Sequence, residues 1–177
     1  MRPYAVRLML VAIAAGGAVA AVPASAADGG MCQLSGNATF TKGPSTTDHP
    51  FTYTFTGDLT GCQSNNGAPP SGTIATLQPA TASGSCGSNT SNGLALVTWA
   101  DKSLSVVQYS TQSVTAGVAL QGTVVPSAKV GKKTYKTTKY AGYGAAGVLF
   151  FQANPQECAG NGVTTAPITG AVGLGKQ

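Results

Sequence analysis

The densest group of residues that could do chemistry lies between positions 129 and 143. This short stretch holds five of the eight lysines in the chain, interleaved with tyrosines. Clustered ammonium groups attract anionic polymers. Aromatic rings between them can also stack on nucleic-acid bases, but export argues against nucleic acid as the natural target. The stretch therefore suggests binding to anionic cell-wall polymer, acidic glycan or phospholipid headgroups. The residues assigned to this site are Lys129, Lys132, Lys133, Tyr135, Lys136, Lys139, Tyr140 and Tyr143.

The same stretch has a structural interpretation. An exposed hairpin or edge strand also collects lysines, because charge on an edge prevents pairing with the edge of another molecule. The sequence leaves both interpretations open, with the hairpin or edge strand favoured.

Catalytic groups are scarce, since charged residues make up only 8% of the chain against roughly 25% in an ordinary globular protein. His49, the single histidine, stands between Asp48 and Pro50. No G-x-S-x-G motif supplies a nucleophile for it, so a turn ahead of a strand is favoured over a catalytic triad. The five carboxylates are isolated in sequence, which favours neither a glycosidase pair nor a calcium site. The prediction is a non-enzymatic protein without metal or cofactor.

Two further motifs favour structural roles. Residues 142–147 match G-x-G-x-x-G, but a dinucleotide loop must open a helix, and the apolar residues 148–151 that follow are typical of a strand. Trp99 lies in the apolar stretch 96–99, where a core position is favoured over an exposed platform for stacking sugars.

The cysteines predict two disulfides. Cys32, Cys62, Cys86 and Cys158 lie 24 or more residues apart, without the Cys-x-x-Cys pairs of zinc or redox sites. If successive strands alternate in direction, the first two cysteines share one end of the fold and the last two share the other. This favours Cys32–Cys62 with Cys86–Cys158, while Cys62–Cys86 with Cys32–Cys158 stays open as the alternative.

Residues 1–26 are typical of a secretory signal peptide. Arginines precede an apolar run over 8–22, and Ala24-Ser25-Ala26 is a small-x-small cleavage site. Fifteen apolar residues are too few for a membrane span, which needs about 20. Loss of the two leader arginines would lower the formal net charge from +5 to +3. We expect residues 27–177 to form a single domain, a monomer that is secreted or associated with the cell envelope, without a transmembrane segment and without nucleic acid as a partner.

Beyond the leader, apolar residues recur at every second position, as at Phe51, Tyr53 and Phe55 or over 114–124. Period two indicates strands with one buried face, and many short strands separated by Gly and Asn turns indicate an antiparallel sandwich or barrel. Residues 81–92 are expected to form a loop. Strands are predicted at 32–41, 50–61, 72–79, 93–100, 103–110, 113–125, 145–152 and 163–174.

Several of these stretches resemble small secreted actinobacterial proteins that have a presumed immunoglobulin-like sandwich and no established function. The resemblance implies an immunoglobulin-like sandwich and an export route, but no activity. Together with the strand pattern and the cysteines, this predicts an immunoglobulin-like antiparallel β-sandwich of seven to nine strands with two disulfides. It departs over 129–144, where the family tends to have a short Gly-rich return. The similar stretches are residues 32–40, 57–62, 97–101, 122–124 and 158–174.

Other functions remain open. A small-ligand carrier of the secreted chromoprotein type would require an apolar cleft with exposed aromatic residues. A hydrolase would require His49 beside an acid and a hydroxyl in a concavity, and a protease inhibitor would require a protruding loop, for which 81–92 is the candidate.

Overall fold

The computed structural model describes residues 29–64, 69–114 and 117–176. The predicted signal peptide lies outside these residues. The elements are, in chain order, β1 (Gly30–Thr41), β2 (His49–Ser64), β3 (Gly72–Thr76), β4 (Ala80–Gly84), β5 (Asn89–Trp99), β6 (Leu104–Val114), β7 (Gly117–Val125), β8 (Ser127–Val130), β9 (Lys133–Lys136), β10 (Gly144–Phe151), α1 (Pro155–Ala159) and β11 (Thr165–Gly175).

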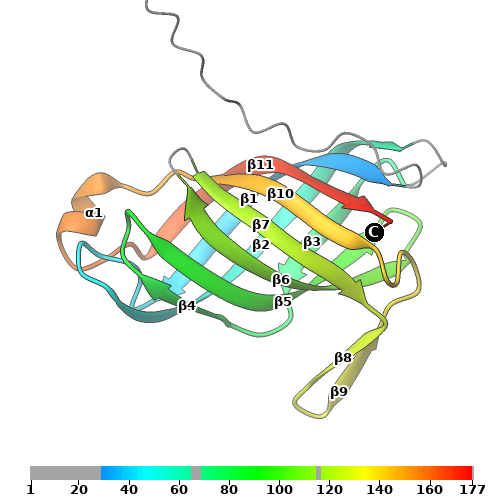
Figure 1. Cartoon of the computed structure of the whole chain (residues 1–177), viewed down its shortest axis with the longest axis horizontal. Helices are drawn as coiled ribbons and strands as arrows, with labels where there is room; N and C mark the ends of the chain where they lie inside the picture. Colours follow the sequence, from blue (N-terminus) through cyan, green and yellow to red (C-terminus); the bar gives the residue numbers. More distant parts are fainter. Residues whose placement is uncertain (1–28, 65–68, 115–116, 177) are drawn as a thin grey trace, which may run out of the picture.

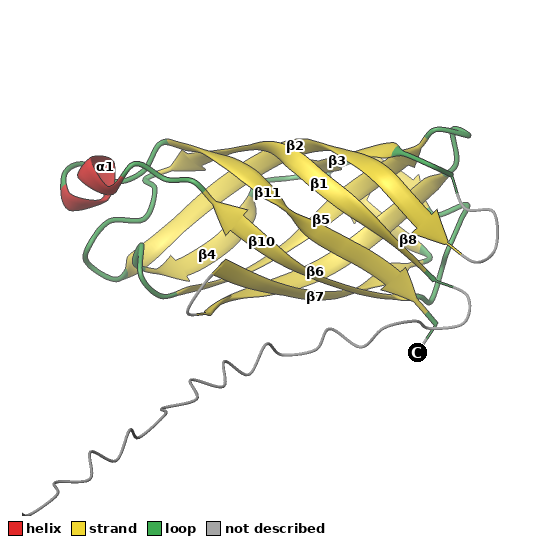
Figure 2. Ribbon diagram, turned by 90° about the horizontal axis from the view of Figure 1, so that it is seen from above, coloured by secondary structure: helices red, strands yellow, loops and turns green. Residues whose placement is uncertain are grey.

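The main sheet closes on itself into an eight-stranded barrel (Figures 1 and 2). Each barrel strand pairs antiparallel with the one before it and the one after it, and β11 returns to pair with β1, where Gly30 lies opposite Leu174. Strands β3 and β4 both pair with β2 and β5, so together they fill one place in the barrel. The hairpin β8–β9 is separate from this sheet.

The all-β prediction is confirmed, and the immunoglobulin-like sandwich is corrected to a barrel. Period-two alternation is the same in both architectures, because each gives a strand one inner and one outer face. Closure depends on the pairing of the first strand with the last, which a local pattern does not encode.

Two predictions of local structure, one of a loop and one of a strand, are also wrong. The loop expected over 81–92 contains most of β4 and the start of β5. Its Ser, Thr and Asn residues alternate between the inner and outer faces of these two strands. The single strand expected over 113–125 is divided, since Val114 closes β6 and pairs back with Gly117 of β7. Alternating parity alone does not reveal that break.

Inward positions of the strands form one core. Phe51, Tyr53 and Phe55 alternate with threonines that face outward, as their sequence spacing predicts. Inward glycines let the wall bend where it must. Gly36 and Gly57 face each other on β1 and β2, and a Cβ on Gly36 would lie 2.2 Å from the Thr56 carbonyl oxygen.

A β-bulge places the first disulfide. The β1–β2 register shifts so that Gly61 and Cys62 together oppose Cys32, and Gly61 adopts φ 57, which glycine tolerates. Cys62 thereby comes opposite the inward-facing Cys32, and the two form a disulfide.

The second disulfide, Cys86–Cys158, joins the β4–β5 turn to α1 at the opposite end of the barrel. Asn154 caps α1 by accepting a hydrogen bond from the Gln156 amide. The two pairs are those that alternating strand direction favours. We call the end with α1 the helix end, and the end with Cys32–Cys62, from which β8–β9 leaves, the hairpin end (Figure 1).

Candidate functional site

The interior of the barrel is not completely filled at the hairpin end. An apolar cavity of about 60 Å³ lies between the walls there. Its lining includes Gln63, which is exposed next to the last residue of β2, so the cavity reaches the surface at this end. The side chains that give it its apolar character come from most of the barrel strands, and include Phe55, Leu59, Val97, Trp99, Leu120 and Leu174.

Small residues at inward positions leave this space. Ala95 and Ala145 line the cavity from β5 and β10, where larger side chains would reach across it. Gly72 on β3 lies next to Trp99, which also lines the cavity. A Cβ on Gly72 would already lie 3.2 Å from the Trp99 ring. The cavity was not predicted from the sequence, because it depends on which small residues come together in space. Small residues at inward positions of several strands were the signal that could have indicated it.

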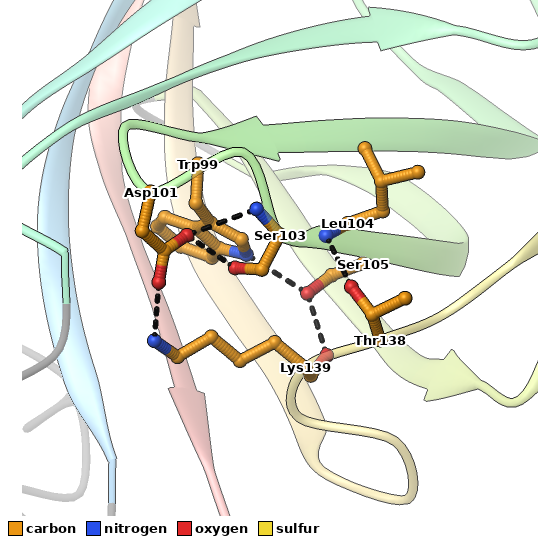
Figure 3. A network of polar contacts seen from close by, with 7 residues as sticks. All are labelled: Trp99, Asp101, Ser103, Leu104, Ser105, Thr138 and Lys139. Atoms are coloured by element: carbon orange, nitrogen blue, oxygen red, sulfur yellow. Dashed lines mark hydrogen bonds and ion pairs between the residues drawn. The ribbon is translucent and has the colours of Figure 1, made fainter.

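Trp99 forms one wall of the cavity and is held by a hydrogen bond. Its indole Nε1 donates to Ser105 Oγ at 2.9 Å, and Ser105 Oγ donates to the Lys139 carbonyl oxygen at 2.7 Å (Figure 3). Trp99 is only 6% exposed, so the predicted core position is confirmed. The ring is therefore fixed in orientation as well as buried.

Tyr140 covers Trp99 from the outside. Their rings meet edge to face with centroids 5.5 Å apart, and Tyr143 packs on Tyr140 at 5.3 Å. Tyr140 adopts φ 64, a left-handed conformation that is uncommon for an aromatic residue. The amide of Tyr143 donates to the Tyr140 carbonyl at 3.0 Å and closes this turn. Burial raises the pKa of the Tyr140 hydroxyl above its ordinary value, so it stays protonated at neutral pH.

The segment over 137–143 returns from the hairpin to the barrel. Leu104 and Thr138 exchange two hydrogen bonds of 2.8 Å, one from the Leu104 amide to Thr138 Oγ1 and one from the Thr138 amide to the Leu104 carbonyl. An ion pair of 2.8 Å joins Lys139 Nζ to Asp101 (Figure 3). The hydrogen bond from Lys139, followed by those from Ser103, lowers the pKa of Asp101 to about 2.

The structure therefore divides the predicted lysine and tyrosine site into two parts. Lys139, Tyr140 and Tyr143 belong to the returning segment and pack on the barrel. The remaining predicted residues lie on the projecting hairpin, and are Lys129, Lys132, Lys133, Tyr135 and Lys136.

The hairpin β8–β9 is a short two-stranded ribbon. Val130 pairs with Lys133, and Gly131 between them adopts φ 58, as the first central residue of a type II′ turn requires. Its four lysines are exposed, and none of them forms an ion pair with a described carboxylate. Lys133 Nζ lies 4.6 Å from the centroid of the Tyr135 ring. The interpretation of this stretch as an exposed hairpin is confirmed.

A buried hydroxyl cluster bounds the cavity region from within the barrel. Tyr53 Oη lies 2.8 Å from Ser91 Oγ and 3.2 Å from Tyr109 Oη, and Ser91 Oγ lies 2.6 Å from Thr111 Oγ1. Burial raises the pKa of both tyrosines. The cluster is neutral at ordinary pH, and its members satisfy one another.

His49 lies at the helix end, far along the barrel from the cavity. Its Nδ1 lies 2.9 Å from the Thr47 carbonyl, and its Nε2 lies 3.1 Å from that of Lys42 and 3.2 Å from that of Gly43. These backbone acceptors, that of Thr47 first, raise the pKa of His49. Both ring nitrogens are thus engaged by the backbone of the preceding turn. His49 itself begins β2 and pairs with Gly84, so the predicted turn ends one residue before it.

The glycine motif and the turn at Cys86 have structural roles, and Ala145 and Ala146 of the glycine motif also line the cavity. The glycine motif over 142–147 leads into β10 and not into a helix, as its strand interpretation predicts. The turn at Cys86 is tied down by the disulfide to α1. Among the described residues, no three His, Cys, Asp or Glu side chains gather into a group that could hold a metal ion. None of the described helices is long and apolar enough to cross a membrane.

No protein-family model, no curated protein and no solved structure matches this chain. The resemblance to small secreted actinobacterial proteins therefore stays a prediction.

Proposed function

We propose that this chain is a secreted, non-enzymatic barrel that carries a small apolar ligand in the cavity at the hairpin end. The observation that carries the proposal is that cavity, which is apolar in its lining and reaches the surface. An eight-stranded barrel has an interior just wide enough either to be filled by side chains or to hold one small ligand. Two disulfides are in keeping with an oxidising compartment outside the cytosol.

The size of the cavity limits the ligand. At about 60 Å³ it is smaller than the roughly 150 Å³ cavity that accepts a benzene molecule in an engineered protein. A slender chain that enters from the surface fits these dimensions better than a ring system. Every part of it inside the cavity must be apolar, because an unpaired polar group there would lose its hydrogen bonds to water.

Trp99 offers a direct test, because it is the single tryptophan of the chain and it lines the cavity. A short-chain alcohol with a terminal bromine should quench Trp99 fluorescence in a saturable manner. Ala95→Leu fills the cavity from β5 and should abolish saturable quenching. Ala119→Leu makes the same change on the outer face of β7 and should leave quenching intact.

Circular dichroism would establish that both variants keep the fold. Absence of saturable quenching in the wild-type chain, or equal quenching in the folded Ala95→Leu variant, would show that the cavity is not a binding site.

The projecting hairpin supports a second candidate function, adhesion to anionic cell-wall polymer. Lysines 129, 132, 133 and 136 are exposed on it without a described acidic partner, so their charges can face a polyanion. Neutralising Lys132, Lys133 and Lys136 together with glutamine should weaken retention on isolated cell walls and flatten its dependence on salt. Lys42→Gln, at the helix end, is the control. Retention equal to that of the wild-type chain would refute adhesion through the hairpin.

A further inference from the structure

Positive charge is concentrated at the end of the barrel where the cavity opens. Seven of the eight lysines lie on segments of the hairpin end, and only Lys42 lies at the helix end. The seven are Lys102 in the β5–β6 turn, Lys129, Lys132, Lys133 and Lys136 on the β8–β9 hairpin, Lys139 in the returning segment, and Lys176 after β11.

Acidic residues do not balance this charge within the described residues. Asp101 is the carboxylate at the hairpin end, and it is already paired with Lys139. Asp58 lies on the outer wall of β2, and Asp48 and Glu157 lie at the helix end. A ligand that approaches the cavity therefore meets a positive potential, which is favourable for an anion and unfavourable for a cation.

The cavity itself excludes charge. Its lining contains no lysine and no carboxylate, so a charged group drawn inside would lose its hydration without gaining a partner. The charge of any bound molecule must stay at the rim. Two of the lysines are close to the rim along the chain, because Lys102 follows Trp99 by three residues and Lys139 precedes Tyr140, and both Trp99 and Tyr140 line the cavity.

A ligand that matches both the apolar lining and the cationic rim is an amphiphile. We propose that the cavity takes the hydrocarbon end of a single-chain amphiphile whose anionic headgroup, a carboxylate or a phosphate, stays among the lysines of the hairpin end. This inference rests on the proposed carrier function and specifies its ligand. It also gives the two features at the hairpin end, the cavity and the lysines, one common ligand.

The test compares three probes that differ only in their headgroup. Each has the same short chain with a terminal bromine, and the headgroup is a carboxylate, a neutral alcohol or a trimethylammonium group. Quenching of Trp99 should give the tightest binding for the carboxylate and the weakest for the ammonium probe. At an ionic strength of about 0.01 M, where screening acts over about 30 Å, we expect the carboxylate to bind roughly tenfold more tightly than the alcohol. At about 1 M, where the screening length is about 3 Å, this preference should vanish.

Substitution of lysines by glutamine shows which of them cause the preference for the carboxylate probe. Lys102→Gln combined with Lys132→Gln should reduce the carboxylate preference several-fold and leave alcohol binding unchanged. Lys42→Gln, at the helix end, should change neither. Because these substitutions change only residues outside the strands, the variants should keep the fold, and circular dichroism would verify that they do.

The outcomes separate the two proposals. If alcohol and carboxylate bind equally at low salt, the anionic headgroup is refuted while the carrier function stands. If no probe quenches Trp99, both are refuted. If the carboxylate probe binds, additional quenching by vesicles of anionic phospholipid with brominated chains would identify a membrane lipid as a source of the ligand, and its absence would indicate a free amphiphile.

Discussion

The two ends of the barrel differ in how their interior is closed, although the same strands run through both. At the helix end, rings fill the space between the walls. Phe40 lies 6.1 Å from Phe51, 5.8 Å from Tyr53 and 6.3 Å from Phe151 between ring centroids. The turn at Cys86 and the helix α1 are then joined across this end by the second disulfide. The helix end is thus packed and covalently fixed.

At the hairpin end, glycine and alanine take several inward positions, and the cavity remains. The segments around it are held by hydrogen bonds and one ion pair, together with a disulfide between the neighbouring strands β1 and β2. Closure of the sheet does not by itself decide whether side chains fill the interior of a barrel. The size of the residues at inward positions decides it, and here size differs between the two ends.

The largest effect should come from removing the disulfide of the helix end. Cys86 and Cys158 are 72 residues apart, and a loop of this length predicts a loss of about 4 kcal/mol in the free energy of unfolding when both become alanine. Urea denaturation would measure it. Binding of the bromoalcohol probe, extrapolated to the folded state, should stay the same, because the disulfide lies away from the cavity.

Removal of the Cys32–Cys62 disulfide makes the matched comparison. Its loop is shorter, with a separation of 30, so the loss of stability should be slightly smaller, but probe binding should change because both cysteines line the cavity. Equal effects of the two disulfides on probe binding would contradict the division between the ends.

An intermediate effect is expected where the two regions meet, at the hydroxyl cluster. Tyr53→Phe removes the only described hydrogen-bond partner of Tyr109 Oη and one of the two partners of Ser91, and should cost about 1–3 kcal/mol. Tyr109→Phe should lower the free energy of unfolding by less, because Tyr53 keeps its hydrogen bond with Ser91. Urea denaturation of both variants and of the double variant gives the coupling energy, and full additivity would mean that the two hydroxyls do not act together.

Much of the wall could be predicted from the sequence. Alternation at Phe51, Tyr53 and Phe55 predicts which side of β2 faces inward, and strand direction favours the two disulfides that the structure contains. Both features depend on local geometry or on the order of strands along the chain. The buried position of Trp99 follows from its apolar neighbours in the same way.

Closure, the cavity and the division of the lysine stretch could not be predicted, because each depends on contacts between distant segments. The barrel requires β1 to meet β11, and the cavity requires Ala95 and Ala145 to come together from different strands. Lys136 and Lys139 are only three residues apart, but Lys136 lies on the hairpin and Lys139 on the barrel, since hydrogen bonds between Leu104 and Thr138 return the chain to the barrel between them.

The smallest effect should come from the ion pair at the rim of the cavity. The folded-state pKa of Asp101 is about 2, below its ordinary value of 3.8, so its contribution to stability is fully present above pH 3.8 and is lost as the pH falls toward about 2. Asp101→Asn should therefore lower the urea midpoint slightly at neutral pH, and the difference from the wild-type chain should disappear by about pH 2. High salt should also reduce it, since the pair is partly exposed. Asp58→Asn on the outer wall is the control, and an Asp101→Asn difference that persists unchanged through acid pH would show that the carboxylate charge does not hold the returning segment at the rim.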